Sequence, residues 1–359
     1  MPDARQWQAA CDPHLLRALR RFLKTLPPGA PVGVALSAGV DSAMLALHTA
    51  VAAADAGRAV HCLHVHHGLQ PAADEWLDQA QRLAGLLGAV CHDRRVRVTL
   101  AGQGLEAAAR AARYPALAEM AAAVPLAHLL LAHHQDDQAE TVLLRLLRGA
   151  GPAGLGAMAA TTRVDSLICH RPWLDQPRRK ILQAAQRFAA LSAWQPAQDP
   201  SNLDSRYARG ALRGALAPVL DAHWPAWRQA LARHARQARE LDTWMRAAAQ
   251  ADWQRLDPRD DDDSFSLAAW RGLPAERQAP VLRFWLFSRG LRMPTEARLQ
   301  AWLTQLRGVH ALGHDRRVQL RHEGHWIVVR KGRVGLARGT PDAHFGAAPA
   351  PAAGFVKTH

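Results

Sequence analysis

Cysteine is scarce in this chain of 359 residues, and its few copies are scattered. The sequence holds four of them, Cys11, Cys62, Cys91 and Cys169, and no two have the C-x-x-C spacing of zinc or redox sites. This absence argues against a zinc ribbon, a redox dithiol and an iron–sulfur site with paired cysteine ligands. Because scattered thiols fit a reducing compartment, we expect the protein to be cytoplasmic.

Long apolar runs are also missing. No stretch reaches the ~20 consecutive uncharged apolar residues that a membrane span needs. The first twenty residues include Asp3, Arg5, Asp12, Arg17 and Arg20, which leave no apolar core for a signal peptide. We therefore expect no membrane partner and no secretory leader.

Acidic residues are too few to balance the basic ones. Lys and Arg total 45 against 31 Asp and Glu, so the net charge is +14 and the sequence pI is about 11.0. Such an excess attracts polyanions, and nucleic acid is the commonest polyanionic partner of a basic enzyme. Only four of the cations are lysines, a bias that a GC-rich genome also produces. Charge alone therefore leaves a nucleic-acid partner and compositional drift both open.

The first half of the chain alternates short apolar runs with helical spacing. The runs cover residues 32–36, 60–65, 90–98, 128–132 and 166–170. Stretches such as 76–87 and 105–122 have apolar residues at three-to-four spacing, which is typical of amphipathic helices. Strands that alternate with helices predict right-handed βαβ units and a parallel sheet.

The second half is mostly helical in its spacing. We expect a connecting helix over 218–256, then a loop at 259–263 in which four consecutive aspartates are solvated. Amphipathic helix follows over 264–307, and residues 318–334 alternate like a hairpin. The Ala- and Pro-rich residues 339–359 predict a disordered tail. The helical spacing of Trp224, Trp227, Trp244 and Trp253 favours packing over base stacking.

A polar loop follows the first predicted strand and opens a helix. It reads Ser37-Ala38-Gly39-Val40-Asp41-Ser42. A turn from strand to helix presents free backbone N–H groups and the positive end of the helix dipole, which together bind phosphate. Ser37 and Ser42 add hydroxyls, and Asp41 could hold Mg²⁺. No lysine follows the glycine, so this is no Walker A loop; the pattern resembles the PP-loop of ATP pyrophosphatases. An ordinary serine-capped helix start is the alternative.

Two clusters of polar residues follow other predicted strands. One is His66-His67-Gly68-Leu69, and the other is His133-His134-Gln135-Asp136-Asp137-Gln138-Ala139-Glu140-Thr141. In an open α/β sheet the carboxyl ends of strands line the ligand crevice, so we expect both clusters to converge with the loop. Capping of a helix by Asp137 and Glu140 is the simpler alternative.

A third set of charges lies on the predicted helix between the two clusters. Glu106, Arg110 and Arg113 share one face through i+4 and i+3 steps, as a surface salt-bridge ladder would. Arg113 could instead clamp a phosphate or the charge of a transition state, because its planar fork suits both.

Taken in series, the motifs resemble the tRNA(Ile)-lysidine synthetase family. They cover residues 37–42, 64–69, 106–114, 133–149 and 199–202 in the family's order, and residues 273–295 resemble its middle tRNA-binding domain more loosely. The resemblance implies a PP-loop α/β domain over 1–217 with a five-stranded parallel sheet in the order 3-2-1-4-5. A connecting helix over 218–256 and a smaller, mostly helical tRNA-binding domain over 257–338 would follow.

The resemblance also implies a reaction. ATP, with Mg²⁺, would adenylate C2 of the wobble cytidine of tRNA(Ile) with a CAU anticodon, and free L-lysine would then displace AMP to give lysidine. The implied ATP-binding residues are Ser37, Ala38, Gly39, Val40, Asp41, Ser42, His64 and His66. The implied catalytic residues are Asp41, Arg113, Asp136, Asp137 and Glu140, with Asp41 and secondarily Asp137 as metal ligands. The implied tRNA-binding residues are Arg110, Arg145, Arg148, Arg206, Arg209 and Arg213.

Two departures from the family pattern stand out. Ala38 replaces the usual second glycine of the loop, and Gly210 replaces an asparagine between Arg209 and Arg213. Ala at a position with positive φ costs on the order of 1 kcal/mol. Another PP-loop tRNA-modifying enzyme, such as a thiolase, and an inactive tRNA-binding paralogue are the competing interpretations, and a homodimer is left open.

Overall fold

The computed structural model describes residues 3–99, 105–198, 204–261, 263–309 and 318–340. Contacts divide the chain into two compact units, one that runs to Arg239 and one that begins at Glu240. Of the helices in these described ranges, none combines the length and the apolar character that crossing a membrane requires.

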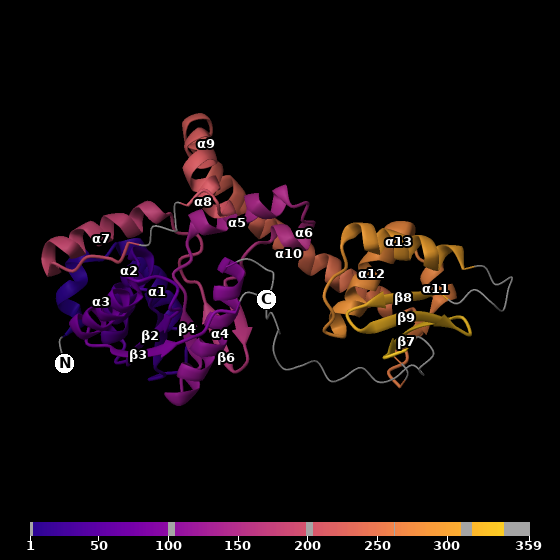
Figure 1. Ribbon diagram of the computed structural model, residues 1–359, viewed down its shortest axis with the longest axis horizontal. Coiled ribbons are helices and arrows are strands. Elements are labelled where there is room, and N and C mark those ends of the chain that lie inside the picture. Colours follow the sequence, from indigo (N-terminus) through magenta and orange to yellow (C-terminus); the bar gives the residue numbers. More distant parts are fainter. Residues whose placement is uncertain (1–2, 100–104, 199–203, 262, 310–317, 341–359) are drawn as a thin grey trace. The chain divides into compact units, whose positions relative to one another are not determined.

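The first unit is built on a six-stranded sheet (Figure 1). Its strands are β1 (Val32–Ala35), β2 (Val60–His66), β3 (Val90–Arg95), β4 (His128–Leu130), β5 (Thr161–Val164) and β6 (Leu167–His170). The order is β3-β2-β1-β4-β6-β5, with every pair parallel except β5 and β6. The predicted α/β class and the order of the five predicted strands are confirmed.

The number of strands was one too few. β5 pairs antiparallel with β6 at the edge of the sheet, so the sheet is mixed. The two strands join through Asp165, whose φ of +52° makes the tight turn without a glycine. β5 was missed because its residues are only partly buried and form no apolar run.

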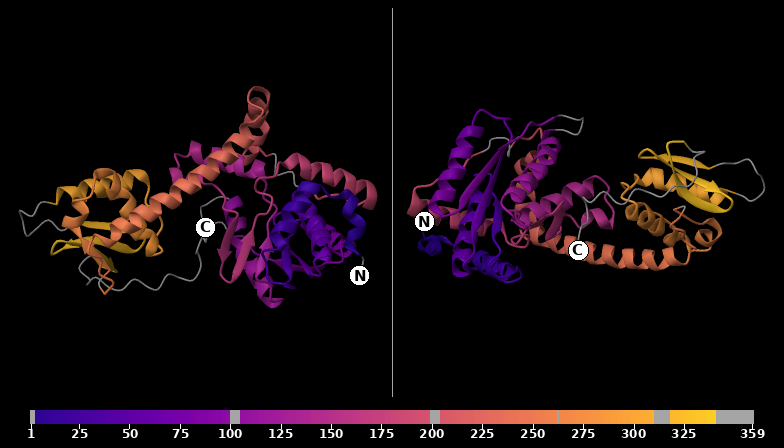
Figure 2. Two further views of the ribbon diagram at one scale, coloured as in Figure 1. Left: turned by 180° about the vertical axis from the view of Figure 1, so that it is seen from behind. Right: turned by 90° about the horizontal axis from the view of Figure 1, so that it is seen from below.

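Helices alternate with the strands of this sheet and continue after its last strand. They are η1 (Ala4–Ala10), α1 (Pro13–Leu23), α2 (Val40–Asp55), α3 (Ala73–Leu86), α4 (Leu105–Ala123), α5 (Gln135–Leu147), α6 (Pro152–Leu155), α7 (Arg178–Ser192), α8 (Ala208–Ala211), the π-helical turn η3 (Leu212–Leu216), α9 (Ala217–His223) and α10 (Trp227–Gln254). α10 runs from the first unit into the second (Figure 2). α4 continues through Pro115, which lies inside the helix.

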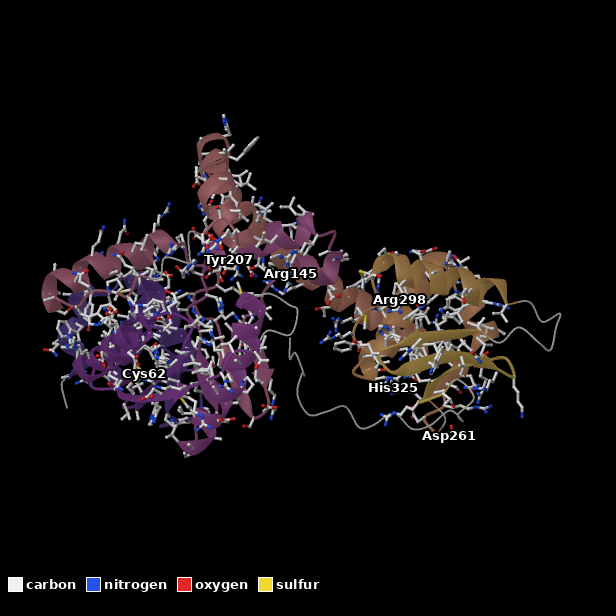
Figure 3. All side chains as sticks on the ribbon, in the orientation of Figure 1. Cys62, Arg145, Tyr207, Asp261, Arg298 and His325 are labelled. Atoms are coloured by element: carbon white, nitrogen blue, oxygen red, sulfur yellow. The ribbon has the colours of Figure 1, made fainter. Side chains whose placement is uncertain are left out.

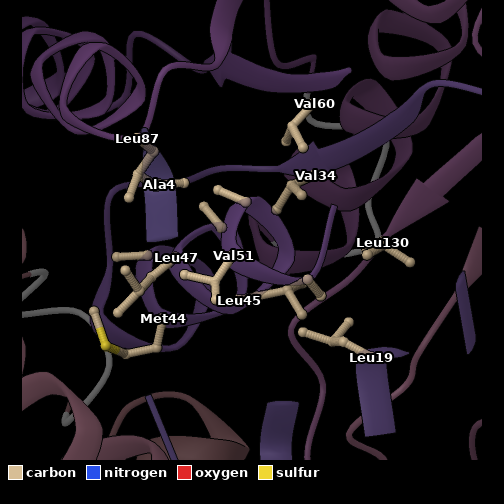
Figure 4. Close-up of a cluster of buried hydrophobic side chains, with 14 of the residues drawn as sticks. Ala4, Leu19, Val34, Met44, Leu45, Leu47, Val51, Val60, Leu87 and Leu130 are labelled. Atoms are coloured by element: carbon tan, nitrogen blue, oxygen red, sulfur yellow. The ribbon is translucent and has the colours of Figure 1, made fainter. Parts of the chain in front are cut away.

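The main core of this unit lies between the sheet and α2. Twelve consecutive residues of α2, from Ser42 to Ala53, are buried, because the helix is enclosed by β1 and by its helical neighbours. Leu45, Leu47 and Val51 pack in this core with Val34 of β1 (Figure 4). The rigid core fixes where α2 begins, and therefore where the loop before it lies.

The second unit joins helices to a small antiparallel sheet. It contains β7 (Ser264–Ser266), α11 (Leu267–Arg271), α12 (Ala275–Ser288), α13 (Glu296–Gly308), β8 (Gln319–His322), β9 (His325–Arg330) and β10 (Arg333–Arg338). The sheet order is β7-β10-β9-β8. The hairpin expected over 318–334 is present as β8 and β9, and it turns at Glu323 and Gly324, both with positive φ.

Some expectations for the second half were wrong. Asp263, expected in a solvated loop, is 1% exposed because it pairs with Arg289 and accepts a hydrogen bond from Trp285 Nε1. Trp227 and Trp253 are buried as expected, but Trp224 and Trp244 are 61% and 69% exposed. The predicted disordered tail after 340 lies outside the described residues.

Candidate active site

The loop between β1 and α2 is folded by its two serines. Ser42 Oγ accepts a hydrogen bond from the Ser37 backbone N–H (3.1 Å) and donates one to the Gly39 carbonyl (3.0 Å). The two hydroxyl oxygens lie 3.0 Å apart. Gly39, the N-cap of α2, makes no side-chain capping bond, so the first turn keeps backbone N–H groups for a ligand. A loop of this kind is suited to phosphate oxygens.

Ala38 adopts the left-handed backbone conformation in which an alanine costs more than the glycine usual at this position. Its φ is +62° and its side chain is fully buried in the core beside α2. An L-residue pays roughly 1–2 kcal/mol in this region, so the loop carries some strain. The Ala38 carbonyl accepts a hydrogen bond from Ala197 N (3.0 Å), which ties the loop to the segment after α7.

His64 and His66 lie on β2, the strand that pairs with β1. His64 Nδ1 donates to the Leu36 carbonyl at 2.8 Å, so His64 supports the backbone just before the loop. Burial lowers the pKa of His64, which favours the neutral ring. His66 is buried, and its Nε2 lies 3.3 Å from Asp74 Oδ1 at the start of α3. The ATP-binding role of both residues stays a prediction.

Asp41 lies at the centre of a charged cluster. Arg178, the first residue of α7, donates from Nε to Oδ1 and from Nη2 to Oδ2 of Asp41, both at 3.2 Å. His134 Nε2 lies 3.6 Å from Asp41 Oδ1. Burial alone would raise the pKa of Asp41, but His134 and Arg178 outweigh it and lower that pKa to about 2. The carboxylate is therefore ionised at neutral pH.

The start of α5 brings the second polar cluster to the same place. His134 is its N-cap and forms a capping box with Asp137: the ring accepts from Asp137 N, and Asp137 Oδ2 accepts from His134 N. Asp136 accepts from the Arg178 backbone N–H (3.0 Å) and pairs with Arg228 Nε (2.8 Å). The predicted convergence of this cluster with the loop is thus present, and capping accounts for only part of it.

Glu140 and the second oxygen of Asp137 share one arginine. Arg213 donates to both carboxylate oxygens of Glu140, at 2.7 and 2.9 Å, and lies 3.4 Å from Asp137 Oδ1. Glu140 is only 6% exposed, so this bidentate pair is largely shielded from water. Burial alone would lower the pKa of Arg213, but the carboxylates of Glu140 and Asp137 outweigh burial and raise that pKa above its ordinary value.

α4 contributes the two arginines that were expected on its outer face. Arg110 and Arg113 are both exposed. Arg110 lies over the ring of Tyr114, with its guanidinium carbon 5.7 Å from the ring centre. Burial and the positive charge of Arg113 lower the pKa of His67 to about 4. The side chain of Glu106 lies outside the described part of the structure.

The remaining arginines expected to bind tRNA differ in how they are held. Arg145 donates to the carbonyls of Gly154 and Ala157, and Arg206 pairs with Asp204 (the region of Arg145 and Tyr207 in Figure 3). Arg209 Nη2 donates to Thr141 Oγ1 at 3.3 Å, whereas Arg148 is exposed at the end of α5. Arg145 and Arg213 therefore bind groups of the protein itself, and the tRNA-binding role of the set stays a prediction.

Two site residues were missed from the sequence. Arg178 and Arg228 pair with the acidic residues of the loop and of α5, but neither was assigned to the site. Arg178 is 137 positions from Asp41, and nothing in the local pattern distinguishes it from other arginines. The only available signal was its position after Pro177, where a helix can begin.

The donor set suits Mg²⁺ better than a metal bound in a closed protein cage. No group of three or more His, Cys, Asp or Glu in the described ranges is arranged to hold a metal ion. Asp41 supplies a partly exposed, ionised carboxylate, and Ser37 and Ser42 supply hydroxyl oxygens. Mg²⁺ typically takes one or two carboxylates and completes its shell with substrate phosphates and water, so these residues fit it.

Two family models match the chain. A PP-loop domain, an ATP-binding family, covers residues 11–220, and a TilS substrate binding domain covers residues 265–334. A curated tRNA(Ile)-lysidine synthase from Bordetella bronchiseptica is 51% identical over 326 residues, which are 90% of this chain and 94% of the relative.

The chain belongs to the tRNA(Ile)-lysidine synthase family.

Other members of the family support this placement. The protein of Bordetella pertussis is 52% identical over 314 residues, which are 87% of this chain and 98% of the relative. The protein of Ralstonia nicotianae is 47% identical over 288 residues, but these are only 60% of its length. The resemblance stated from the motifs is confirmed, and with it an enzyme that binds ATP and a tRNA substrate.

A solved structure supports the fold of the first unit. A U34-tRNA thiolase from Methanococcus maripaludis aligns with a TM-score of 0.53 over 62% of this chain and 78% of its own. Its sequence identity is 15%, so the likeness concerns the fold alone.

Proposed function

We propose that this protein joins lysine to C2 of the wobble cytidine in tRNA(Ile) with a CAU anticodon. In the first step the cytidine O2 attacks the α-phosphate of ATP and pyrophosphate leaves. In the second, the lysine ε-amine attacks C2, AMP leaves with the former O2, and the amine gives up a proton. The observation that carries the proposal is the contact between residues 37–42, which we call the phosphate loop, and the start of α5. There Asp41 lies beside His134 and pairs with Arg178.

The phosphate loop and Asp41 would serve the first step. The free N–H groups at the start of α2 and the hydroxyl of Ser37 suit the phosphates of ATP. Asp41 would hold Mg²⁺, which supplies positive charge to stabilise the leaving pyrophosphate. Arg113, exposed on α4, would stabilise the charge that develops between ATP and the base.

The carboxylates of α5 would serve the second step. Asp136 is held by Arg228 and a backbone N–H, and Glu140 is held by both donors of Arg213. Asp137 Oδ2 is held by His134, but its Oδ1 has only the 3.4 Å contact with Arg213. We therefore assign to Asp137 the first contact with the lysine ammonium group, with Glu140 and Asp136 as its electrostatic neighbours. A carboxylate there can also accept the proton that the amine loses.

The arginines around α5 and α8 would bind the tRNA backbone. Arg110 and Arg148 are exposed, and Arg206 and Arg209 lie on the segment next to α5. Contacts of this kind would make tRNA affinity fall steeply with salt, because each neutralised phosphate releases counterions. A cytoplasmic location and a homodimer stay predictions.

The decisive experiment identifies the product. The purified full-length chain is incubated with tRNA(Ile) bearing a CAU anticodon, ATP, Mg²⁺ and lysine, and the mass of the wobble nucleoside is measured. We expect the mass of lysidine and tRNA-dependent exchange between ATP and pyrophosphate. A thio product would indicate a thiolase, and tRNA binding without either signal would indicate an inactive paralogue.

Two aspartates of one helix provide a matched test. Asp41→Ala should abolish both signals, because the carboxylate at the phosphate loop is lost. Asp55 lies at the opposite end of α2 and pairs with Arg20 on the surface. Asp55→Ala should therefore leave both signals intact, and equal losses in the two variants would contradict the assignment of the site.

A further inference from the structure

The phosphate loop has no cation of its own. Residues 37–42 provide hydroxyls, backbone N–H groups and one carboxylate, but no lysine or arginine. The triphosphate of ATP carries several negative charges, and enzymes that transfer its groups stabilise them with arginine, lysine or a metal ion. A cation must therefore come from elsewhere in the fold, and Arg178 pairs directly with Asp41 of the loop.

Arg178 is fixed at its backbone and accessible at its side chain. Its N–H donates to Asp136 Oδ1 at 3.0 Å, and Gln135 N donates to the Gln176 carbonyl at 2.9 Å, so the turn before α7 is tied to the start of α5. Its side chain is 38% exposed. The guanidinium can therefore reach a ligand in front of the loop without a change in the backbone.

Asp41 can release Arg178 more easily than Glu140 can release Arg213. Glu140 is buried and depends on Arg213 for both of its oxygens, so it would be left as an unpaired buried charge. Asp41 is 27% exposed and keeps His134 at 3.6 Å when Arg178 leaves. With nucleotide bound, Asp41 can also take Mg²⁺ as its counter-charge, so the carboxylate no longer needs Arg178 to neutralise it.

We propose that Arg178 moves from Asp41 to the β- and γ-phosphates of bound ATP and holds the pyrophosphate as it leaves. The proposal rests on the proposed function, since it requires that the loop binds ATP. In the free protein Arg178 neutralises Asp41, and in the complex the same fork of N–H donors pairs with phosphate oxygens, for which its geometry is equally suited.

Nucleotides that differ in their phosphates test this proposal. Isothermal titration measures the binding of ATP with Mg²⁺, of inorganic pyrophosphate with Mg²⁺, and of AMP to the full-length chain and its variants. Arg178→Gln should weaken ATP and pyrophosphate roughly 10- to 100-fold, because charge-assisted hydrogen bonds are lost. AMP lacks the two outer phosphates, so its affinity should stay at the wild-type value.

Two further variants sharpen the test. Arg179→Gln removes the same charge from the neighbouring, exposed residue of α7 and should change none of the three affinities. Arg178→Lys keeps the charge without the fork and should fall between wild type and Arg178→Gln for pyrophosphate. Thermal denaturation checks that each variant is folded.

The outcomes separate the two proposals. If Arg178→Gln binds ATP and pyrophosphate like wild type, or loses AMP as much as ATP, the assignment of Arg178 is overturned while the proposed function stands. If the wild-type chain does not bind ATP at all, both proposals fail.

Discussion

Gly210 occupies a position at which the structure has no room for a side chain. It is buried in α8, and a Cβ added to it would lie 2.0 Å from the Asp204 carbonyl oxygen and 2.6 Å from the carbonyl carbon. Both atoms belong to the backbone, so they cannot rotate away. Asp204 O accepts the N–H of Tyr207 at 3.1 Å, and any displacement that makes room for the Cβ strains this bond.

The cost of Gly210→Ala follows from three contributions. Overpacking costs about 2 kcal/mol, and loss of the Asp204–Tyr207 hydrogen bond costs about 1 kcal/mol. Alanine regains about 1 kcal/mol through its helix propensity. The net loss of about 2 kcal/mol should lower the melting temperature by roughly 4–8 °C in a unit of this size. Gly210→Asn should be worse, since its side chain is larger.

Gly214 is the matched control for this prediction. It lies in the next helical turn, η3, and a Cβ added there meets nothing within 4 Å. Gly214→Ala should therefore be neutral or stabilising by up to about 1 kcal/mol. Differential scanning calorimetry compares the two variants, and equal melting temperatures would refute the steric reasoning. Restored stability or higher lysidine formation in Gly210→Asn would refute it as well.

Two more predictions concern buried residues near the loop. Ala38→Gly should change the free energy of unfolding by less than about 1 kcal/mol. Relief of left-handed strain gains ~1–2 kcal/mol, but this is offset by the loss of a buried methyl group (~0.8 kcal/mol) and by a more flexible unfolded chain (~0.4–1 kcal/mol). A loss above about 2 kcal/mol in urea denaturation would contradict this prediction. His48 is fully buried, its Nε2 accepts from Asp12 N, its Nδ1 donates to the Met44 carbonyl, and burial lowers its pKa to about 4. The unfolded chain takes up a proton on His48 near pH 6.5, and the native chain does not. The free energy of unfolding should therefore fall by about 2–3 kcal/mol between pH 7 and pH 4.5 on account of His48. His48→Gln should remove that part of the acid sensitivity, as measured by denaturation curves at the two pH values.

The central strands of the sheet could be predicted from the sequence because they are largely buried. The run at 32–36 is apolar throughout and the run at 60–65 is interrupted only by His61 and His64, and they became β1 and β2 almost to the residue. The edge strand β5 has no such run, so only pairing with β6 defines it. Helical spacing also could not separate exposed Trp224 from buried Trp227, because the helix expected over 218–256 is broken there: Trp224 follows the end of α9 and Trp227 begins α10.

The site was predictable only where its residues are local. The loop and the start of α5 each carry several polar residues within a few positions, so the pattern predicted that they converge, and in the structure Asp41 lies beside His134. The arginines that complete the site come from α7, η3 and α10. Long-range ion pairs of this kind leave no periodic trace, since any arginine of a basic chain could supply them.

The dependence of these acidic groups on arginines from later helices limits how the chain can be shortened. A recombinant fragment that ends at residue 177 would leave Asp41, Asp136 and Glu140 without Arg178, Arg228 and Arg213, and a fragment that ends at 217 would still lack Arg228. Carboxylates left without these arginines repel one another, and buried Glu140 would keep an unpaired charge, so such fragments should be destabilised at the site. A chain that extends to Arg239, where the first compact unit ends, keeps every one of these pairs.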